Sequence, residues 1–294
     1  MESLACLNCG NELKHTFANL GASPLCNEIV DPEKLHEGQQ SYPLHTYVCD
    51  QCFLVQVGTC VSPKEIYRDY SYFSSYSDSW LDHANKYTEM MMAEFDINAE
   101  SFVVEIASND GYLLQYFKEK NIPILGVEPS NTVAKAAIEK GIPTEEMFFG
   151  EETARNLKGK YQAADLILGN NVLAHVPKIH DFVAGLELML SDDGIMTFEF
   201  PHLRQLVKNN QFDTIYHEHF FYYSLTAVQS IFKKHDLKIF DVQELSTHGG
   251  SIRIFVTRAS NKKYQLRDSV HQMLSQEKEE GYLDVSFYQS FDRN

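Results

Sequence analysis

The chain has 294 residues, of which 44% are hydrophobic and 22% charged, as in ordinary globular proteins of one or two domains. Acidic residues outnumber basic ones by 41 to 25, which argues against sequence-independent binding of nucleic acid, because such binding needs a basic surface. The sequence has no apolar run of the ~18 residues that span a membrane, and MESLACLNCG is unlike a signal peptide, so we expect a cytoplasmic protein.

Four of the six cysteines form two Cys-x-x-Cys pairs, Cys6 with Cys9 and Cys49 with Cys52, and 39 residues separate the pairs. Each such turn brings two thiolates onto one ion, so two turns complete a tetrahedral site. Disulfides or unrelated buried thiols are the alternatives, but a reducing cytoplasm disfavours disulfides. Because all four positions are filled by protein, we expect a structural zinc ion within a zinc-binding domain over residues 1–68.

The rest of the chain divides by its hydrophobic pattern. An aromatic loop runs into a helix over residues 69–93, and from about residue 100 strands alternate with helices, which predicts an α/β fold with a doubly wound parallel sheet. Residues 259–294 are polar and read as a helical tail or linker. The expected strands are 101–107, 124–129, 164–170, 194–200, 237–245 and 251–258, and the expected helices are 111–120, 131–141, 151–159, 179–190 and 225–235.

The first strand of the sheet leads into EIASNDGYLL, where an acidic residue, a turn of small residues and a helix follow one another. A doubly wound sheet opens a cofactor cleft in this way, since small residues let the backbone approach the ligand. Only Gly111 remains of a glycine-rich fingerprint, beside Ser108 and Asn109, so the turn alone is a weak signal.

A second carboxylate strengthens the signal. Glu128 ends the next strand, 23 residues after Glu105, at the place where a ribose with two free hydroxyls is bound. A turn with few glycines and two acids suits a cofactor without phosphate and with a cationic end, such as S-adenosylmethionine. Solvated carboxylates at strand ends are the alternative. The exit of the 164–170 strand adds Asn170 and His175 at the same rim, although spacing alone favours a core histidine at position 175 that is satisfied by a backbone carbonyl.

The stretch TIYHEHFFYYS places Tyr216, His217, Glu218 and His219 in an aromatic run. If these groups are buried, each needs a hydrogen-bond partner. They form either a satisfied structural network or a cleft that handles protons. Farther on, the glycines of THGGSIR permit a tight bend before a strand, from which His248 and Arg253 could reach a ligand; a hairpin corner with a solvated arginine is the alternative.

In order, the cysteine knuckles, DYSYFSSYS, EIASNDGYLL, GVEPS, NNVLAHV, YHEHFFYYS and HGGSIR resemble the S-adenosylmethionine-dependent C-methyltransferases that act on nucleotide-linked 4-keto deoxysugars. The resemblance covers residues 1 to about 258 and implies a Rossmann-like class I methyltransferase domain over residues 69–258. Family members carry a further C-terminal α/β domain, and we expect this chain to be without it.

The resemblance also implies the residues of the site. The cofactor would contact Glu105, Ser108, Asn109 and Gly111 at its methionine and ribose end, Glu128 at the ribose hydroxyls, Met147 and Phe148 at the adenine, and Asn170 at its floor. The active-site positions of the family match Tyr70, His175, Tyr216, Glu218 and His219, together with His217.

Methylation of carbon beside a ketone needs a base to remove a proton and donors that meet the enolate oxygen. We assign His219 as the base, because neutral imidazole is available near pH 7. An extended segment would place His217 and His219 on one face, whereas a turn could let Glu218 orient an imidazole. Tyr216, Tyr70 or His175 would donate to the oxygen or hold the sugar.

Two other functions remain open from the sequence. The acceptor atom could be oxygen or nitrogen of a sugar or other small molecule, which would need no enolate. The chain could also be a non-catalytic module that binds zinc and S-adenosylmethionine. In each case the expected partner is a small molecule, with neither nucleic acid nor membrane, and the chain could be a monomer or a homodimer.

Overall fold

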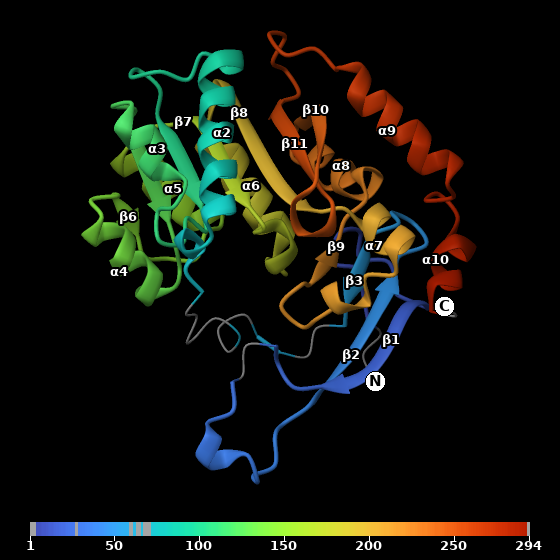
Figure 1. Cartoon of the computed structure of the whole chain (residues 1–294). Helices are drawn as coiled ribbons and strands as arrows, with labels where there is room; N and C mark the ends of the chain where they lie inside the picture. Colours follow the sequence, from blue (N-terminus) through green and yellow to red (C-terminus); the bar gives the residue numbers. More distant parts are fainter. Residues whose placement is uncertain (1–3, 27–28, 59–60, 63–65, 67–71, 293–294) are drawn as a thin grey trace.

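The computed structural model describes residues 4–26, 29–58, 61–62, 66 and 72–292. They form two sheets (Figure 1): a small antiparallel sheet at the N-terminal end and a larger mixed sheet with helices on both faces. In the described part of the chain no helix is long and apolar enough to cross a membrane.

The small sheet takes its last strand from far along the chain. Its order is β1-β2-β3-β9, and all neighbours are antiparallel. Three strands come from the N-terminal region and follow the cysteine turns, whereas the fourth belongs to the YHEHFFYYS segment. The strands are β1 (His15–Ser23), β2 (Tyr42–Val48), β3 (Val55–Val57) and β9 (Phe221–Tyr222), and a short 3₁₀ helix, η1 (Pro32–Lys34), precedes β2.

The large sheet has the order β10-β11-β8-β7-β4-β5-β6. Strands β4 to β8 are parallel, as predicted, but β11 is antiparallel to both of its neighbours. Only residues 246–250 connect β10 to β11, and so short a connection permits an antiparallel pair only. The strands are β4 (Val103–Ile106), β5 (Ile124–Val127), β6 (Thr144–Glu145), β7 (Ala164–Asn170), β8 (Leu190–Pro201), β10 (Leu237–Leu245) and β11 (Ser251–Arg258).

Helices cover the two faces of this sheet and enclose one hydrophobic core on each (Figure 1). One core includes side chains of α2 (Asp78–Phe95), α3 (Leu114–Glu119) and α4 (Asn131–Glu139). The other includes α5 (Glu151–Lys160), α6 (Ile179–Met189) and α8 (Leu225–Lys233). The strands are apolar on both sides for this reason. The predicted helices are confirmed, with ends that differ by a few residues.

Helix α2 begins and ends by ordinary capping. The side chain of Ser77 accepts a hydrogen bond from the backbone N–H of Trp80, and Asp96 adopts the left-handed conformation that stops the helix. Its first turn lies beside the turn after β4, because Trp80 stacks on Tyr112. A further short helix, α7 (Leu203–Asn209), follows β8 and was not predicted.

Residues 259–294 contain two helices that pack on the rest of the protein. They are α9 (Asp268–Glu279) and α10 (Val285–Phe291), and α10 lies beside β1 (Figure 1). The ring of Phe291 stacks on Phe17 of β1 at 4.7 Å between centroids and on Phe212 at 4.5 Å. The segment thus contributes aromatic side chains to the core of the small sheet.

Helix α9 is anchored by a buried carboxylate. Glu277 is 0% exposed and accepts hydrogen bonds from the backbone N–H groups of Leu225 (2.6 Å) and Thr226 (2.8 Å) at the start of α8. His202 Nε2 donates to the same side chain at 3.0 Å. The negative charge lies at the positive end of α8, where free N–H groups need partners.

We predict that Glu277→Ala lowers the free energy of unfolding by about 3 kcal/mol, because the N–H groups of α8 and the His202 ring would stay buried without an acceptor. Denaturant unfolding measures this loss. The matched control is Glu279→Gln, an exposed position of the same helix, which should change the free energy by less than about 0.5 kcal/mol. Equal stability of the two variants would contradict the anchoring role.

Candidate active site

The four predicted cysteine ligands meet at one point. The sulfur atoms of Cys6, Cys9, Cys49 and Cys52 all lie within 4.8 Å of one another, with Cys9 Sγ to Cys49 Sγ at 3.4 Å and Cys6 Sγ to Cys52 Sγ at 3.6 Å. A tetrahedral zinc ion with Zn–S bonds of ~2.3 Å would hold its sulfurs ~3.8 Å apart. The arrangement therefore fits one four-coordinate zinc ion with no open position for a substrate.

The zinc site is joined to the YHEH segment through the small sheet. Strand β3 begins three residues after Cys52 and pairs with β9, which begins two residues after His219. The backbone N–H of Val57 donates to the carbonyl of Phe220 at 3.0 Å, and the N–H of Phe220 donates to the carbonyl of Ala174 at 2.7 Å. Phe220 thus joins the zinc-bearing sheet to the loop that carries His175.

The turn after β4 has the strained backbone that a close ligand requires. Ala107 (φ 55°), Asn109 (φ 51°) and Gly111 (φ 75°) all adopt the left-handed region. A Cβ at Gly111 would lie 2.7 Å from Cγ1 of Ile142, so this position needs glycine for packing as well. Asn109 Oδ1 accepts from the backbone N–H of Ser74, and Nδ2 donates to the carbonyl of Tyr72. The turn is therefore tied to the loop before α2.

Two predicted cofactor residues in this turn have buried polar atoms without partners. Glu105 is 1% exposed, and among the described residues neither of its carboxylate oxygens has a hydrogen-bond partner. The buried hydroxyl of Ser108 likewise has no hydrogen-bond partner among these residues. Burial, with the nearby charges of Glu128 and Asp110, raises the pKa of Glu105 well above its ordinary value. Such orphaned acceptors fit a ligand that brings a positive charge and hydroxyl donors, as S-adenosylmethionine does.

Glu128 closes the turn from the end of β5. Its carboxylate accepts from the backbone N–H groups of Asn109 (3.0 Å) and Ser130 (2.8 Å), and burial raises its pKa to about 7. Each oxygen therefore has one backbone donor and can accept a second hydrogen bond. The carboxylate lies where the sequence placed the ribose hydroxyls.

The remaining predicted cofactor residues follow neighbouring strands of the sheet. Met147 and Phe148 come after β6; Met147 is half-buried against the core, whereas Phe148 is 47% exposed. Asn170 is half-buried at the end of β7 and donates from Nδ2 to the hydroxyl of Tyr112 at 3.2 Å. The eight predicted residues thus lie at or after the carboxyl ends of β4, β5, β6 and β7, which are parallel neighbours in the sheet.

The YHEH segment is a turn and not a strand. The backbone N–H of His219 donates to the carbonyl of Tyr216 at 3.1 Å, which places these two side chains together and turns His217 away. His217 is 2% exposed, and its Nε2–H points between the carbonyls of Tyr42 and Pro43, both at 3.2 Å. His217 therefore fastens the segment to β2.

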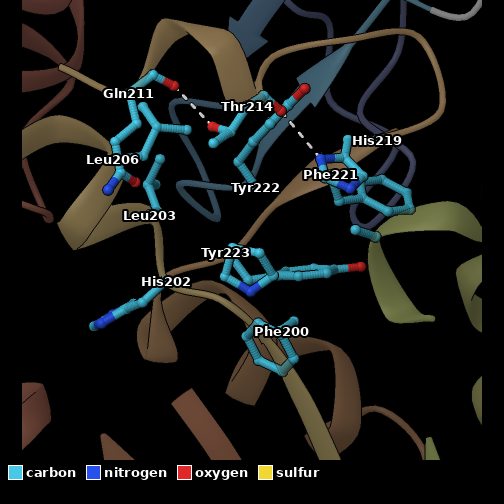
Figure 2. A pocket seen from close by; sticks show the side chains of 12 residues that line it. Phe200, His202, Leu203, Leu206, Gln211, Thr214, His219, Phe221, Tyr222 and Tyr223 are labelled. Atoms are coloured by element: carbon cyan, nitrogen blue, oxygen red, sulfur yellow. Dashed lines mark hydrogen bonds between the residues drawn. The ribbon is translucent and has the colours of Figure 1, made fainter. Parts of the chain in front are cut away.

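The hydrogen bonds of His219 fix which ring nitrogen carries the proton. Nδ1 lies 3.1 Å from the backbone carbonyl of Thr214, which can only accept, so Nδ1 is the donor (Figure 2). In the neutral ring Nε2 then has the free electron pair, and the hydroxyl of Tyr216 donates to it at 2.8 Å. Burial lowers the pKa of His219 to about 4, so the ring is neutral at pH 7.

His175 faces His219 from the loop after β7. The two rings meet edge to face with 4.8 Å between centroids, and the His175 ring donates to the backbone carbonyl of Glu218. Burial, followed by the His219 ring, lowers the pKa of His175 to about 3. The carboxylate of Glu218 accepts from the thiol of Cys26 at 3.0 Å. Tyr70, the fifth predicted residue, lies outside the described residues.

The group that orients His219 is one that the sequence did not indicate. The predicted alternatives included the carboxylate of Glu218, but the backbone carbonyl of Thr214 holds Nδ1. Thr214 lies in the 3₁₀ helix η4 (Phe212–Thr214), and its own hydroxyl donates to the carbonyl of Gln211 (Figure 2). The cavity on this side of the ring, lined by residues such as Leu206 and Tyr222, has a volume of about 10 Å³, which leaves room for one water molecule at most.

Comparison with known proteins agrees with this arrangement. Three family models match in succession: a zinc binding domain over residues 6–67, a methyltransferase domain over residues 80–242 and the C-methyltransferase C-terminal domain over residues 246–294. The C-methyltransferase NovU of Streptomyces niveus is 31% identical over 286 residues, which are 97% of this chain and 68% of the relative.

The chain belongs to the C-methyltransferase family. Its methyltransferase domain has the class I fold, and it is an S-adenosylmethionine-dependent methyltransferase with a four-cysteine zinc site.

Solved structures show the same fold at low identity. A methyltransferase of Anabaena variabilis, described as S-adenosylmethionine-dependent, matches with a TM-score of 0.50 and 12% identity over 67% of this chain and 91% of that one. The PH0226 protein of Pyrococcus horikoshii OT3 matches with a TM-score of 0.50 and 13% identity over 66% of this chain and 99% of that one. At such identities the likeness concerns the fold alone.

One expectation from the sequence is wrong. The family's C-terminal domain was expected to be absent, but its model matches residues 246–294 of this C-methyltransferase. The polar composition of this segment concealed its buried side chains: the aromatic rings by which α10 packs on the small sheet, and Val270 and Met273 of α9, which packs on β10 and α8.

We predict that Cys49→Ser abolishes binding of about one zinc ion per chain and loosens the small sheet, because three thiolates no longer close the tetrahedron. Elemental analysis measures the metal, and the midpoint of thermal unfolding measures the sheet. The matched control is Cys26→Ser, since the exposed Cys26 lies outside the cluster and its replacement should leave the zinc content unchanged. A Cys49→Ser protein with full zinc content would contradict the site.

Proposed function

We propose that this C-methyltransferase methylates a carbon next to the ketone of a nucleotide-linked 4-keto deoxysugar, and that His219 is the base that forms the enolate. The observation that carries the proposal is the state of the His219 ring: its Nδ1–H is held by Thr214, so that Nε2 is the basic atom. The motif resemblance of the sequence supports the sugar substrate.

The cofactor site is proposed to consist of the eight residues around the turn after β4. S-adenosylmethionine, when bound, supplies an electrophilic methyl group. Glu128 would accept from the ribose hydroxyls, since each carboxylate oxygen has room for a second donor. Glu105 and Ser108 would meet the methionine end, where their unpartnered atoms now lie buried. Asn109 and Gly111 shape the turn, Met147 and Phe148 would flank the adenine, and Asn170 would form the floor.

The proton from the sugar carbon would be accepted at Nε2 of His219. The hydroxyl of Tyr216 donates to this atom, so the proton arrives either after the tyrosine turns away or through its hydroxyl. In both cases the Thr214 carbonyl keeps the other nitrogen protonated and stabilises the imidazolium that forms. Tyr70 is proposed to donate to the enolate oxygen or to hold the sugar. His175 lies against His219, and its ring is neutral, so its one N–H serves the Glu218 carbonyl. This ring is proposed to hold the sugar through its other nitrogen, or to donate to the enolate oxygen after releasing that carbonyl.

We predict that His219→Ala lowers the rate of methyl transfer about a thousandfold while binding of S-adenosylhomocysteine is unchanged, because the variant lacks the base but keeps the cofactor turn. Rates are measured with radiolabelled S-adenosylmethionine and affinity by calorimetry. The matched control is His271→Ala, at an exposed position of α9. This variant should keep the wild-type rate of methyl transfer and the wild-type affinity for S-adenosylhomocysteine.

Exchange of the acceptor hydrogen gives an independent check on the enolate. With S-adenosylhomocysteine bound, the wild-type protein should exchange the proton next to the ketone with heavy water, whereas His219→Ala should not. Methyl transfer without exchange or an isotope effect would indicate an oxygen or nitrogen acceptor and overturn the enolate.

The pH profile provides a further prediction. Burial lowers the pKa of His219 to about 4, and the base works only unprotonated, so kcat/KM for the acceptor should stay level as pH falls from 8 to about 5.5 and decline through about 4. The titratable groups that face the ring are His175, His248, Tyr216 and Tyr222. Saturating cofactor excludes the titration of Glu128, whose pKa is about 7. A half-maximal value near pH 6.5 would contradict a buried base.

A further inference from the structure

A second cavity lies between the start of α2 and the 3₁₀ helix η5 (Thr247–Gly249), which connects β10 to β11. Its volume is about 430 Å³, within the usual range for small-molecule sites. It is lined mainly by hydroxyl groups, imidazoles and aromatic rings, and its walls come from segments that the fold brings together from more than 150 residues apart. The lining residues include Tyr72, Ser77, Ser79, Trp80, His83 and His248.

One end of this cavity adjoins the cofactor turn. The carbonyl of Tyr72 accepts from Asn109 Nδ2 at 3.0 Å. Trp80 stacks on Tyr112 at 5.9 Å between centroids, and the hydroxyl of Tyr112 accepts from Asn170 at the proposed floor of the cofactor. A molecule in the cavity would therefore lie next to whatever occupies the turn.

The other end of the cavity is formed by His248. Its ring meets Trp80 edge to face at 5.1 Å between centroids, and a protonated His248 would lower the pKa of His219. The backbone of His248 is left-handed (φ 51°), which is uncommon for a residue other than glycine. The cavity thus extends from the cofactor turn to the connection between β10 and β11.

A buried dyad holds one wall in place. His83 lies 2.7 Å from the carboxylate of Glu199, which is 0% exposed and also accepts from Arg253 at 2.6 Å and from Thr247 at 2.8 Å. Burial alone would raise the pKa of Glu199, but these donors bring it below the ordinary value. The guanidinium of Arg253 also lies 3.1 Å from His83 Nε2, but the shorter contact to the carboxylate makes this nitrogen the donor. Nδ1 then remains for a ligand, since no hydrogen bond to it occurs within the described residues.

The charges of the cavity distinguish a sugar ring from a diphosphate. Lys86 pairs with Asp82 at 2.6 Å, and Arg253 behind the wall pairs with Glu199. Burial lowers the pKa of His248, so this ring is neutral near pH 7. Phosphate groups are recognised by unpaired cations, and the described lining offers hydroxyls, imidazoles and a lysine that is already paired instead. The chemistry therefore suits a neutral ligand with several hydroxyl or keto oxygens.

We propose that this cavity binds the sugar ring of the acceptor, with His83 and His248 in contact with its oxygen substituents and the diphosphate outside. The inference rests on the proposed function and specifies where its substrate lies. Trp80 is the only tryptophan of the chain and lines the cavity, so its fluorescence reports occupancy directly.

The test uses the full chain saturated with S-adenosylhomocysteine. Titration with a nucleoside diphosphate 4-keto-6-deoxyhexose should change the fluorescence of Trp80, whereas the same nucleoside diphosphate without sugar should bind and leave it unchanged. His83→Gln and His248→Gln should each raise the dissociation constant of the nucleotide sugar about tenfold or more and leave that of S-adenosylhomocysteine unchanged, because each loses a hydrogen bond to the ring. His271→Gln, at an exposed position of α9, is the matched control.

A second variant guards against misfolding of the histidine variants. Ser79 is exposed at the cavity wall, so Ser79→Tyr should fold normally and block the ring by bulk. The inference is overturned if these variants bind the nucleotide sugar as the wild type does, or if the free nucleoside diphosphate changes the fluorescence equally. If His219→Ala still abolishes methyl transfer in that case, the proposed function stands and only the position of the sugar is wrong. If the wild type methylates no nucleotide sugar, the proposed function itself fails.

Discussion

The pairing of β3 with β9 is the interaction on which the active site depends. Strand β3 follows the second cysteine knuckle, and β9 follows the His219 turn, so a few backbone hydrogen bonds connect a metal site to a proposed base. A strand of two residues has little stability of its own. Its position is set because the zinc-bearing sheet is closed by four thiolates and packed by α10 from the other side. A zinc ion bound by these thiolates would therefore help to fix the turn that carries His219.

The proposed reaction site combines two walls with different electrostatic character. Around the cofactor turn, carboxylates lie buried with atoms that lack partners, which is costly unless a ligand brings donors or positive charge. Around His219, imidazoles lie buried and neutral, each held by a backbone carbonyl. One wall is prepared for a cation and the other for a neutral molecule that loses a proton. This division suits a reaction in which a sulfonium methyl meets a carbon nucleophile.

Local sequence patterns predicted the strands and helices between residues 100 and 258 well, because alternation of apolar runs is a local property. Contacts between distant segments were not visible in the sequence. Strand β9 joins a sheet whose other strands lie more than 150 residues earlier. The antiparallel direction of β11 follows from its short connection to β10, which the strand pattern did not indicate. The cysteine cluster was predictable because spacing alone defines it. Thr214 was not, since it acts through a carbonyl that every residue has. Likewise, His83 and Glu199 lie in a helix and a strand whose sequences carry no motif, and only the fold brings the two side chains together.

The ion pair between Glu199 and Arg253 also favours one alignment of β11 against β8. The two residues stand directly opposite each other; Arg253 is flanked by Ile252 and Ile254, and Glu199 by Phe198 and Phe200. A slip of one residue would place an isoleucine against the carboxylate and leave both charges buried without a counter-ion, at a cost of several kcal/mol. The ion pair therefore strongly favours one alignment of β8 with β11, and that alignment places Thr247 and His248 at the edge of the sheet.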